Sequence, residues 1–183
     1  MTDFNAVSRL QQGDLSGLEE LVLRYQDKAV RVVYQIVQDE PMAEDIAIET
    51  FLHIADSIRS FDNRRPFEPY LMRSLVHAAL NATRHQAHSV YGDADLEHLE
   101  QLLSTSPTPQ EHVETAELRS EIQRAMAALS PRQRAVIVQR YYLQMSEQEM
   151  AQAASSPPGT IKWLLHQARK SLSALLDKQR IDQ

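Results

Sequence analysis

A series of aromatic, basic and amide side chains recurs at intervals of three and four residues in the middle of the chain. It comprises Tyr70, Arg73, His77, Asn81 and Arg84. On a helix these positions would fall within roughly 80° of arc and share one face. Rings stack on unpaired bases, arginines contact phosphates and amides bond to base edges, as binding of single-stranded nucleic acid requires. The alternative is a solvated helix face that happens to be polar.

A second set of polar residues shares one face of a predicted helix near the C-terminus. The other face is apolar, with Ile161, Leu164, Leu165, Ala168, Leu172 and Leu175. The polar face holds Lys162, Trp163, His166, Gln167 and Lys170. Lysine suits phosphates, glutamine suits base edges, and an aromatic body suits apolar contact in the major groove. The pattern predicts a helix that binds duplex DNA, the alternative being a surface helix whose tryptophan packs on another domain.

A third helix face combines carboxylates with large aliphatic side chains. Its residues are Asp45, Ile48, Glu49, Leu52 and Asp56. They lie opposite an apolar stripe formed by Ala43, Ile46, Ala47, Thr50, Phe51, Ile54 and Ile58. Such a face suits a partner protein that offers arginines around an apolar seam. The alternative is an acidic surface with scattered aliphatic residues, which is common.

The sequence gives little support for an enzymatic function. Glu49, His53 and Asp56 share one helix, and carboxylate–histidine sets can bind metals in helical bundles. A di-metal site needs matching Glu-x-x-His sets on other helices, and the sequence has none. It also has no cysteine, phosphate-binding loop, Ser-His-Asp spacing or dinucleotide fingerprint. We therefore expect no catalytic residue, no metal and no cofactor.

The elements that must position these side chains are helices. Apolar residues at helical spacing predict helices over residues 15–37, 41–58 and 66–85. The third is expected to turn an apolar face to the core, with Phe67, Leu71, Leu75, Ala78 and Ala82. Glycine is scarce and β-branched runs between turn signals are absent, so we predict an all-α fold.

Helix start signals mark the second half of the chain. Thr108, Ser130 and Ser146 are each followed three residues later by Glu or Gln, which is the capping-box pattern. After the last signal we predict a short helix from Glu147 to Ala153, a tight turn, and a longer helix from Pro157 or Pro158. This succession is typical of a helix-turn-helix.

Residues 87–108 contain serine, threonine, glycine and one proline without clear periodicity, and they are acidic. We interpret them as a flexible linker between two small helical domains, residues 1–86 and 109–183.

Charge alternates along the chain. Residues 1–60 carry 5 Lys and Arg against 11 Asp and Glu, and residues 91–121 carry 1 against 8. Residues 61–90 carry 4 against 2, and residues 122–183 carry 9 against 4. The basic parts could thus face a polyanion while the acidic parts face something else, although chance clustering on solvated helices would look similar.

The overall composition is that of a folded protein, with 183 residues, 43% hydrophobic and 24% charged. The sequence contains no run of about 18 apolar residues, so we predict no membrane-spanning helix. The N-terminus lacks a basic region followed by an apolar core, so we expect no secretory signal and a cytoplasmic location.

Four segments of the second half carry a family resemblance: residues 127–134 (AALSPRQR), 145–151 (MSEQEMA), 159–162 (GTIK) and 165–172 (LHQARKSL). In order and spacing they resemble the promoter-binding C-terminal domain of bacterial sigma factors of the small extracytoplasmic-function (ECF) type. Ser155 stands where the family usually has a turn glycine. The candidate residues for duplex DNA are then Ser156, Thr160, Lys162, Trp163, His166, Gln167 and Lys170.

The first half is similar to the same family. Residues 43–46 (AEDI) and 49–52 (ETFL) resemble its polymerase-binding helix. The loop over residues 61–65 resembles the loop that captures an unstacked promoter base, and it adds Asn63, Arg64 and Arg65 to the single-strand candidates. In the stripe that follows, Tyr70 stands for the family's usual tryptophan.

The resemblance implies a sigma factor without catalytic residues that confers promoter specificity on RNA polymerase. Its N-terminal domain would dock on the polymerase clamp and hold the melted non-template strand, and its C-terminal domain would bind the upstream promoter element. The linker would thread toward the active-site channel. The implied partners are core RNA polymerase (clamp and flap), promoter DNA and an anti-sigma factor, although no residue of the chain identifies an anti-sigma factor.

The alternative function is a stand-alone helix-turn-helix transcription regulator. Such a protein normally needs a dimerisation surface to read two half-sites. It would have no need of the acidic face around Asp45 and Glu49.

Overall fold

The computed structural model describes residues 3–83 and 113–181, and the side chains of the second stretch over residues 119–177. Every regular element in these residues is helical, which confirms the predicted all-α class. The chain divides into two compact units, Met1–Arg84 and His85–Gln183. The predicted linker 87–108, the capping box at Thr108 and Arg84 lie outside the described residues.

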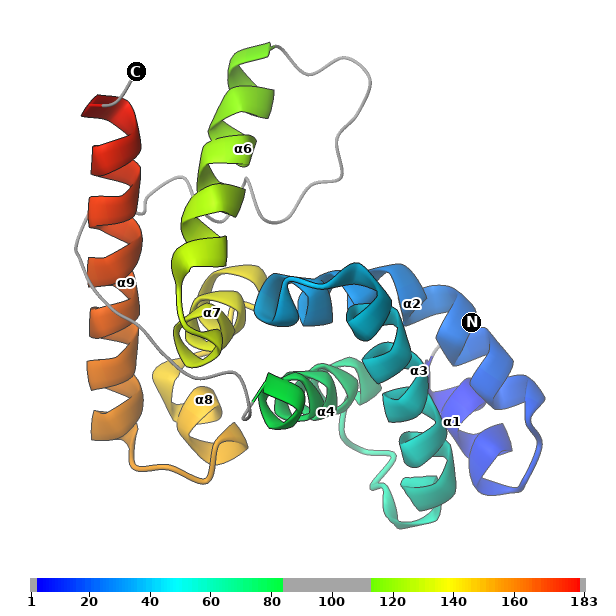
Figure 1. The fold of residues 1–183 in the computed structure, drawn as a ribbon. Coiled ribbons are helices and arrows are strands. Elements are labelled where there is room, and N and C mark those ends of the chain that lie inside the picture. The colour runs from blue at the N-terminus through cyan, green and yellow to red at the C-terminus, as the bar shows by residue number, and fades with distance from the viewer. Residues whose placement is uncertain (1–2, 84–112, 182–183) are drawn as a thin grey trace. The chain divides into compact units, whose positions relative to one another are not determined.

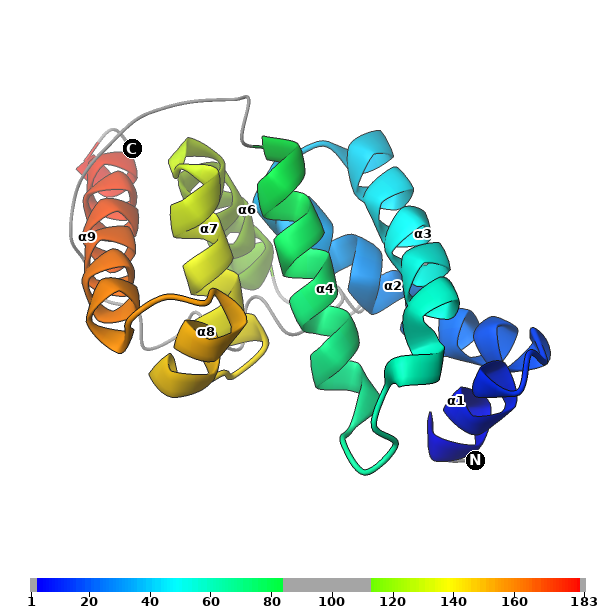
Figure 2. The same ribbon diagram turned by 90° about the horizontal axis from the view of Figure 1, so that it is seen from below.

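The first unit consists of α1 (Asp3–Gln11), α2 (Ser16–Val37), α3 (Glu40–Ser57), the short 3₁₀ helix η1 (Ile58–Ser60) and α4 (Phe67–Ala82). Figure 2 shows α3 and α4 running beside each other with α2 behind them, and α1 at one end of the unit. The three long helices match the predicted ranges closely. Helix α1 was not predicted from the sequence.

The core of the first unit follows the predicted apolar stripes. All seven predicted residues of the α3 stripe are buried. On α4, Phe67, Leu71 and Leu75 are buried as predicted. Ala78 is only half-buried and Ala82 is exposed, so the prediction was wrong for Ala82. Ala82 is the last residue of α4, and the residue buried at this end of the helix is Thr83.

Gly17 allows α1 and α2 to approach closely. A Cβ atom at this position would lie 2.2 Å from the carbonyl oxygen of Ala6 and 2.9 Å from the backbone nitrogen of Leu10. Both contacts are with backbone atoms, which cannot move aside without shifting the helix. Any larger residue at position 17 would therefore push α1 away from α2.

The second unit consists of α6 (Val113–Ala128), α7 (Pro131–Ile137), the π-helical turn η3 (Val138–Tyr142), α8 (Glu147–Ala153) and α9 (Pro158–Ile181). Two predicted capping boxes are confirmed. The Ser130 hydroxyl accepts from the Gln133 backbone, and the Gln133 side chain accepts from the Ser130 backbone at 3.0 Å. Ser146 and Glu149 repeat this exchange at the start of α8.

The pair α8 and α9 forms the predicted helix-turn-helix (Figure 1). Buried Ala151 lies in the last turn of α8, and its carbonyl oxygen accepts from the Ser156 backbone at 3.0 Å. Ser155 has a φ of 46°, in the left-handed region that favours glycine. The turn position at which the family usually has glycine therefore requires this backbone conformation, and a serine adopts it here.

No helix in residues 3–83 or 113–181 combines the length and apolar character that a membrane crossing demands.

Candidate DNA-binding and polymerase-binding surfaces

The predicted single-strand stripe is a continuous face of α4. Arg73, His77 and Asn81 are exposed, and Tyr70 is half-buried. The Asn81 amide nitrogen lies 3.2 Å from the Nδ1 atom of His77, so these two side chains restrain each other. The face opposite the stripe is buried at Phe67, Leu71 and Leu75. Four of the five predicted residues are thus brought together, and Arg84 lies outside the described part of the chain.

An aromatic cluster joins the start of this stripe to the loop that precedes α4. The Tyr70 ring lies 4.8 Å from the Phe61 ring, centroid to centroid, at an interplanar angle of 40°. Phe61 also meets Phe67 edge-on at 6.1 Å, and Phe67 in turn lies 6.0 Å from Tyr25 of α2. The cluster fixes the ring of Tyr70 beside the loop while part of its surface remains exposed.

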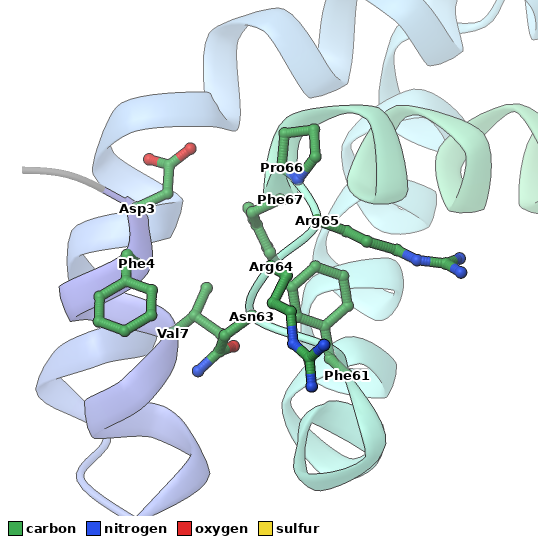
Figure 3. Close-up of a pocket in the computed structure, with 9 residues that line it drawn as sticks. All are labelled: Asp3, Phe4, Val7, Phe61, Asn63, Arg64, Arg65, Pro66 and Phe67. Atoms are coloured by element: carbon green, nitrogen blue, oxygen red, sulfur yellow. The ribbon is translucent and has the colours of Figure 1, made fainter.

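A pocket of about 350 Å³ opens beside the same loop (Figure 3). Its volume falls within the range of small-ligand sites, about 300–1,000 Å³. The loop contributes Asn63, Arg64 and Arg65 to its lining, and both arginines are exposed. The complete lining is Asp3, Phe4, Val7, Phe61, Asn63, Arg64, Arg65, Pro66 and Phe67. The three loop residues predicted to bind single-stranded DNA therefore share one cavity wall.

Three lining residues, Asp3, Phe4 and Val7, come from α1 and were missed by the sequence analysis. The signal that would have found this helix is the helical spacing of Ala6, Val7 and Leu10, all of them buried.

Asp3 is fixed by two residues of α2. It pairs with Arg24 and accepts from the Tyr25 hydroxyl at 2.6 Å. The hydrogen bond to Asp3 raises the pKa of Arg24. Burial, and then the hydrogen bond to Asp3, raise the pKa of Tyr25 well above its ordinary value. Tyr25 is therefore a neutral donor throughout the physiological pH range.

All five residues predicted for the outward face of α3 are exposed. Ile48 is 59% exposed and Leu52 is 55% exposed, so two large aliphatic side chains lie close together on this surface. Asp45, Glu49 and Asp56 are exposed around them. His53 is also exposed, and the described residues contain no group of three or more potential metal-binding side chains.

The polar face of α9 presents its side chains to the surface. Trp163 is 61% exposed, whereas Ile161 is 3% exposed. Lys162, His166 and Lys170 are exposed, and Gln167 is half-buried. Before them, Thr160 is exposed and Ser156 is half-buried, with its hydroxyl donating to the Ala154 carbonyl at 3.1 Å. The seven candidate residues for duplex DNA therefore lie in the turn before α9 and in the first four turns of this helix.

Two family models match this chain. The model of sigma-70 region 2 matches residues 21–89, and the model of sigma-70 region 4 matches residues 119–172. The first covers most of α2 and all of α3 and α4, and the second covers α7, α8 and the first part of α9.

Characterised relatives extend the match over nearly the whole chain. The ECF RNA polymerase sigma factor SigW of Bacillus subtilis is 28% identical over 172 residues, covering 91% of this chain and 92% of SigW. The chain belongs to the ECF sigma factors. The ECF RNA polymerase sigma factor BldN of Streptomyces coelicolor is 27% identical over 93% of this sigma factor and 64% of BldN. As a member of this non-enzymatic family, the protein directs promoter recognition by RNA polymerase.

Solved structures share the fold of this ECF sigma factor. The structure of CnrH in complex with the cytosolic domain of CnrY has a TM-score of 0.63 at 21% identity, over 97% of this chain and 99% of CnrH. The sigma factor RpoE from Bartonella quintana, solved with the anti-sigma factor NepR, has a TM-score of 0.63 at 17% identity, over 87% and 96% of the two chains.

Proposed function

We propose that this ECF sigma factor uses three different helix faces for three steps of transcription initiation. The α3 face binds the polymerase clamp, the α4 stripe with its adjoining pocket holds the melted non-template strand, and the α9 face binds the upstream element. The observation that carries the proposal is the chemistry of these faces. Each helix buries an apolar stripe and exposes a different kind of surface: acidic–aliphatic, aromatic–basic, and basic with a tryptophan.

The α4 stripe and the pocket fit an unpaired strand with one base turned out of the stack. Removing a base from the stack costs a few kcal/mol, which contacts in a pocket must offset. The pocket has aromatic walls at Phe4, Phe61 and Phe67 and exposed arginines at its rim. Tyr70 would stack on a neighbouring base, and Arg73 would contact the backbone phosphates.

The α9 face fits the major groove of the upstream element. Lys162 and Lys170 would contact phosphates, Gln167 and His166 would bond to base edges, and Ser156 and Thr160 would contact the backbone near the turn. Trp163 would place its indole against thymine methyl groups or sugar edges.

The α3 face fits a basic partner surface with an apolar centre. Ile48 and Leu52 would become buried, and Asp45, Glu49 and Asp56 would pair with arginines or lysines of the clamp. In this proposal the C-terminal domain, residues 109–183, also meets the polymerase flap. The linker, residues 87–108, threads toward the active-site channel, where its acidic residues mimic nucleic acid.

An anti-sigma factor is a further proposed partner. Support comes from the two structural relatives, since CnrH was solved with the cytosolic domain of CnrY and RpoE with the anti-sigma factor NepR. Both share the fold of this chain. An inhibitor that covers the α3 face would compete directly with the clamp.

A pull-down with bacterial core RNA polymerase tests the proposal against the alternative of a stand-alone regulator. The immobilised sigma factor should retain core polymerase without DNA, and the Asp45→Arg plus Glu49→Arg variant should lose it. A stand-alone regulator would bind its DNA sites as a dimer and retain no polymerase. Retention of polymerase by the wild type and the variant alike would contradict the assignment of the α3 face.

A further inference from the structure

One side chain of α1 holds the segment between α3 and α4 at three points, one in η1 and two in the loop that precedes α4. The Gln11 amide nitrogen donates to the carbonyl oxygens of Ile58 at 3.0 Å and Phe61 at 2.9 Å. Its amide oxygen accepts from the Asn63 amide nitrogen at 2.7 Å. These bonds join residues that are 47 to 52 positions apart in the chain. The Gln11 side chain therefore fixes both the path of the loop and one of its side chains.

The hydrogen bonds of Gln11 also determine the orientation of the Asn63 side-chain amide. Backbone carbonyls can only accept, so both hydrogens of the Gln11 amide are committed to Ile58 and Phe61. Only the oxygen of Gln11 remains for Asn63, and Asn63 must therefore present its nitrogen to α1. Ser8 accepts from the same nitrogen at 3.2 Å. In Figure 3 the Asn63 nitrogen accordingly points toward α1.

Helix α1 is itself firmly attached, which makes it a suitable support. Gly17 permits the close backbone contact with α2 described above. Ion pairs join Arg9 to Glu20 and Arg24 to Asp3 across the two helices. The Tyr25 hydroxyl adds a hydrogen bond to Asp3. The loop is thus tied through Gln11 to a helix that is anchored along its length.

We propose that Gln11 is a positioning residue that shapes the loop over residues 61–65 to receive an unpaired promoter base. The inference rests on the proposed function of the α4 stripe and the pocket. A loop already held in its binding conformation loses less conformational entropy when the strand arrives. It also presents its polar groups at fixed positions, which is what discrimination between bases requires.

The test measures discrimination rather than activity alone. A promoter is first selected from a randomised pool with core polymerase and the wild-type sigma factor. Run-off transcription then compares this promoter with versions carrying single substitutions in the downstream element. Variants are Gln11→Met, which keeps the length without hydrogen bonds, and Gln11→Glu, which keeps an acceptor for Asn63 but has no donor for the two carbonyls. Gln12→Met, at the exposed next residue, is the matched control.

Both Gln11 variants should lower the ratio of activity on the selected promoter to activity on the substituted promoters by about threefold to tenfold, which corresponds to the net free energy of about one hydrogen bond. Gln12→Met should leave the ratio unchanged. A merely structural role would reduce the folded fraction and lower activity on all promoters equally, so the ratio would stay the same. An unchanged ratio with both Gln11 variants would overturn the inference.

Tyr70→Ala, measured in the same assay, separates this inference from the proposed function on which it rests. If Tyr70→Ala changes the preference for the downstream element and the Gln11 variants do not, only the positioning role of Gln11 fails. If neither Tyr70→Ala nor the Gln11 variants change the preference for the downstream element, the assignment of the loop and the α4 stripe to the melted strand fails as well.

Discussion

The Tyr70 ring of α4 lies against the Phe61 ring of the preceding loop, with centroids 4.8 Å apart. This contact joins the two parts of the proposed single-strand site, the helix stripe and the loop beside the pocket. It also holds the tyrosine ring in place before any DNA is bound, which reduces the entropy lost on stacking.

Tyr70→Ala should therefore impair open-complex formation, by about 1–3 kcal/mol if one base stacks on the ring. Arg73→Ala should impair it through the loss of a phosphate contact. A premelted bubble template should rescue Tyr70→Ala more than Arg73→Ala, because the phosphate contact is needed on either template. Permanganate reactivity of unpaired thymines measures the open complex on the duplex template, and run-off transcription measures the rescue on the bubble template.

Tyr70→Phe is the control, since it retains the ring and its contact with Phe61. Duplex binding by the C-terminal domain should be the same in all three variants. Wild-type open-complex formation by both alanine variants on linear duplex would remove the single-strand role of the stripe.

Reversing the charges of Asp45 and Glu49 should weaken binding of core polymerase. Each reversal should cost about 2–5 kcal/mol if the pair is buried in the complex, and much less at a rim. The fold should survive because both residues are exposed on α3. Fluorescence titration with core polymerase measures the affinity, and circular dichroism checks the helices.

A matched control reverses Glu19 and Asp27, which are exposed on α2, and changes the net charge by the same amount. It should bind core polymerase nearly as the wild type does. Equal losses in the two double variants would mean that net charge, and not the α3 face, governs the affinity.

Trp163→Ser should change which upstream sequences are preferred. Trp163 is 61% exposed on α9, whereas Ile161, two residues earlier, is buried, so the indole lies mostly outside the core of this unit. Selection from a randomised promoter pool with each protein measures the preference. Ala174→Ser, at an exposed position three turns further along α9, should leave it unchanged. Identical preferences for wild type and Trp163→Ser would exclude base reading and favour a contact with a partner protein.

Lys162→Ala should act differently from Trp163→Ser. If its contact is mainly to phosphate, binding should weaken almost uniformly across sequences, and the salt slope should fall by about 1. Affinity for the selected upstream element at several salt concentrations checks this. A changed sequence preference with an unchanged salt slope would instead place Lys162 on a base.

Ser155→Gly should stabilise the C-terminal unit. The serine has a φ of 46°, which costs a residue with a side chain about 1 kcal/mol more than glycine. Thermal unfolding should show a gain of about that size. Ser156→Gly is the control at the adjacent position, where the hydroxyl bonds to Ala154, and it should lose stability. A loss with Ser155→Gly would mean that the side chain of Ser155 contributes more than its backbone conformation costs.

Features that depend on local sequence were predictable. The capping boxes at Ser130 and Ser146 fixed the starts of α7 and α8, and α8 has the predicted bounds. The apolar stripe of α3 was predicted in full because helical spacing alone determines it. The exposed faces of α3, α4 and α9 followed as the complements of such stripes.

Features that depend on contacts distant in sequence were not predictable. The hydrogen bonds of Gln11 to Ile58, Phe61 and Asn63 have no local signature, since a glutamine at a helix end is ordinary. The pocket was missed for the same reason, because one of its walls belongs to α1. The burial of Ala82 was predicted wrongly because the spacing of apolar residues does not show where a helix end stops packing against other helices.

Run-off transcription shows whether this sigma factor directs core polymerase to promoters through its α3 face. Purified bacterial core polymerase is given a promoter library with and without this sigma factor, and with the Asp45→Arg plus Glu49→Arg variant. We expect discrete transcripts from a subset of promoters with the wild type, and none of these transcripts without the protein or with the Asp45→Arg plus Glu49→Arg variant. The same transcripts in the presence and absence of the protein would contradict this expectation.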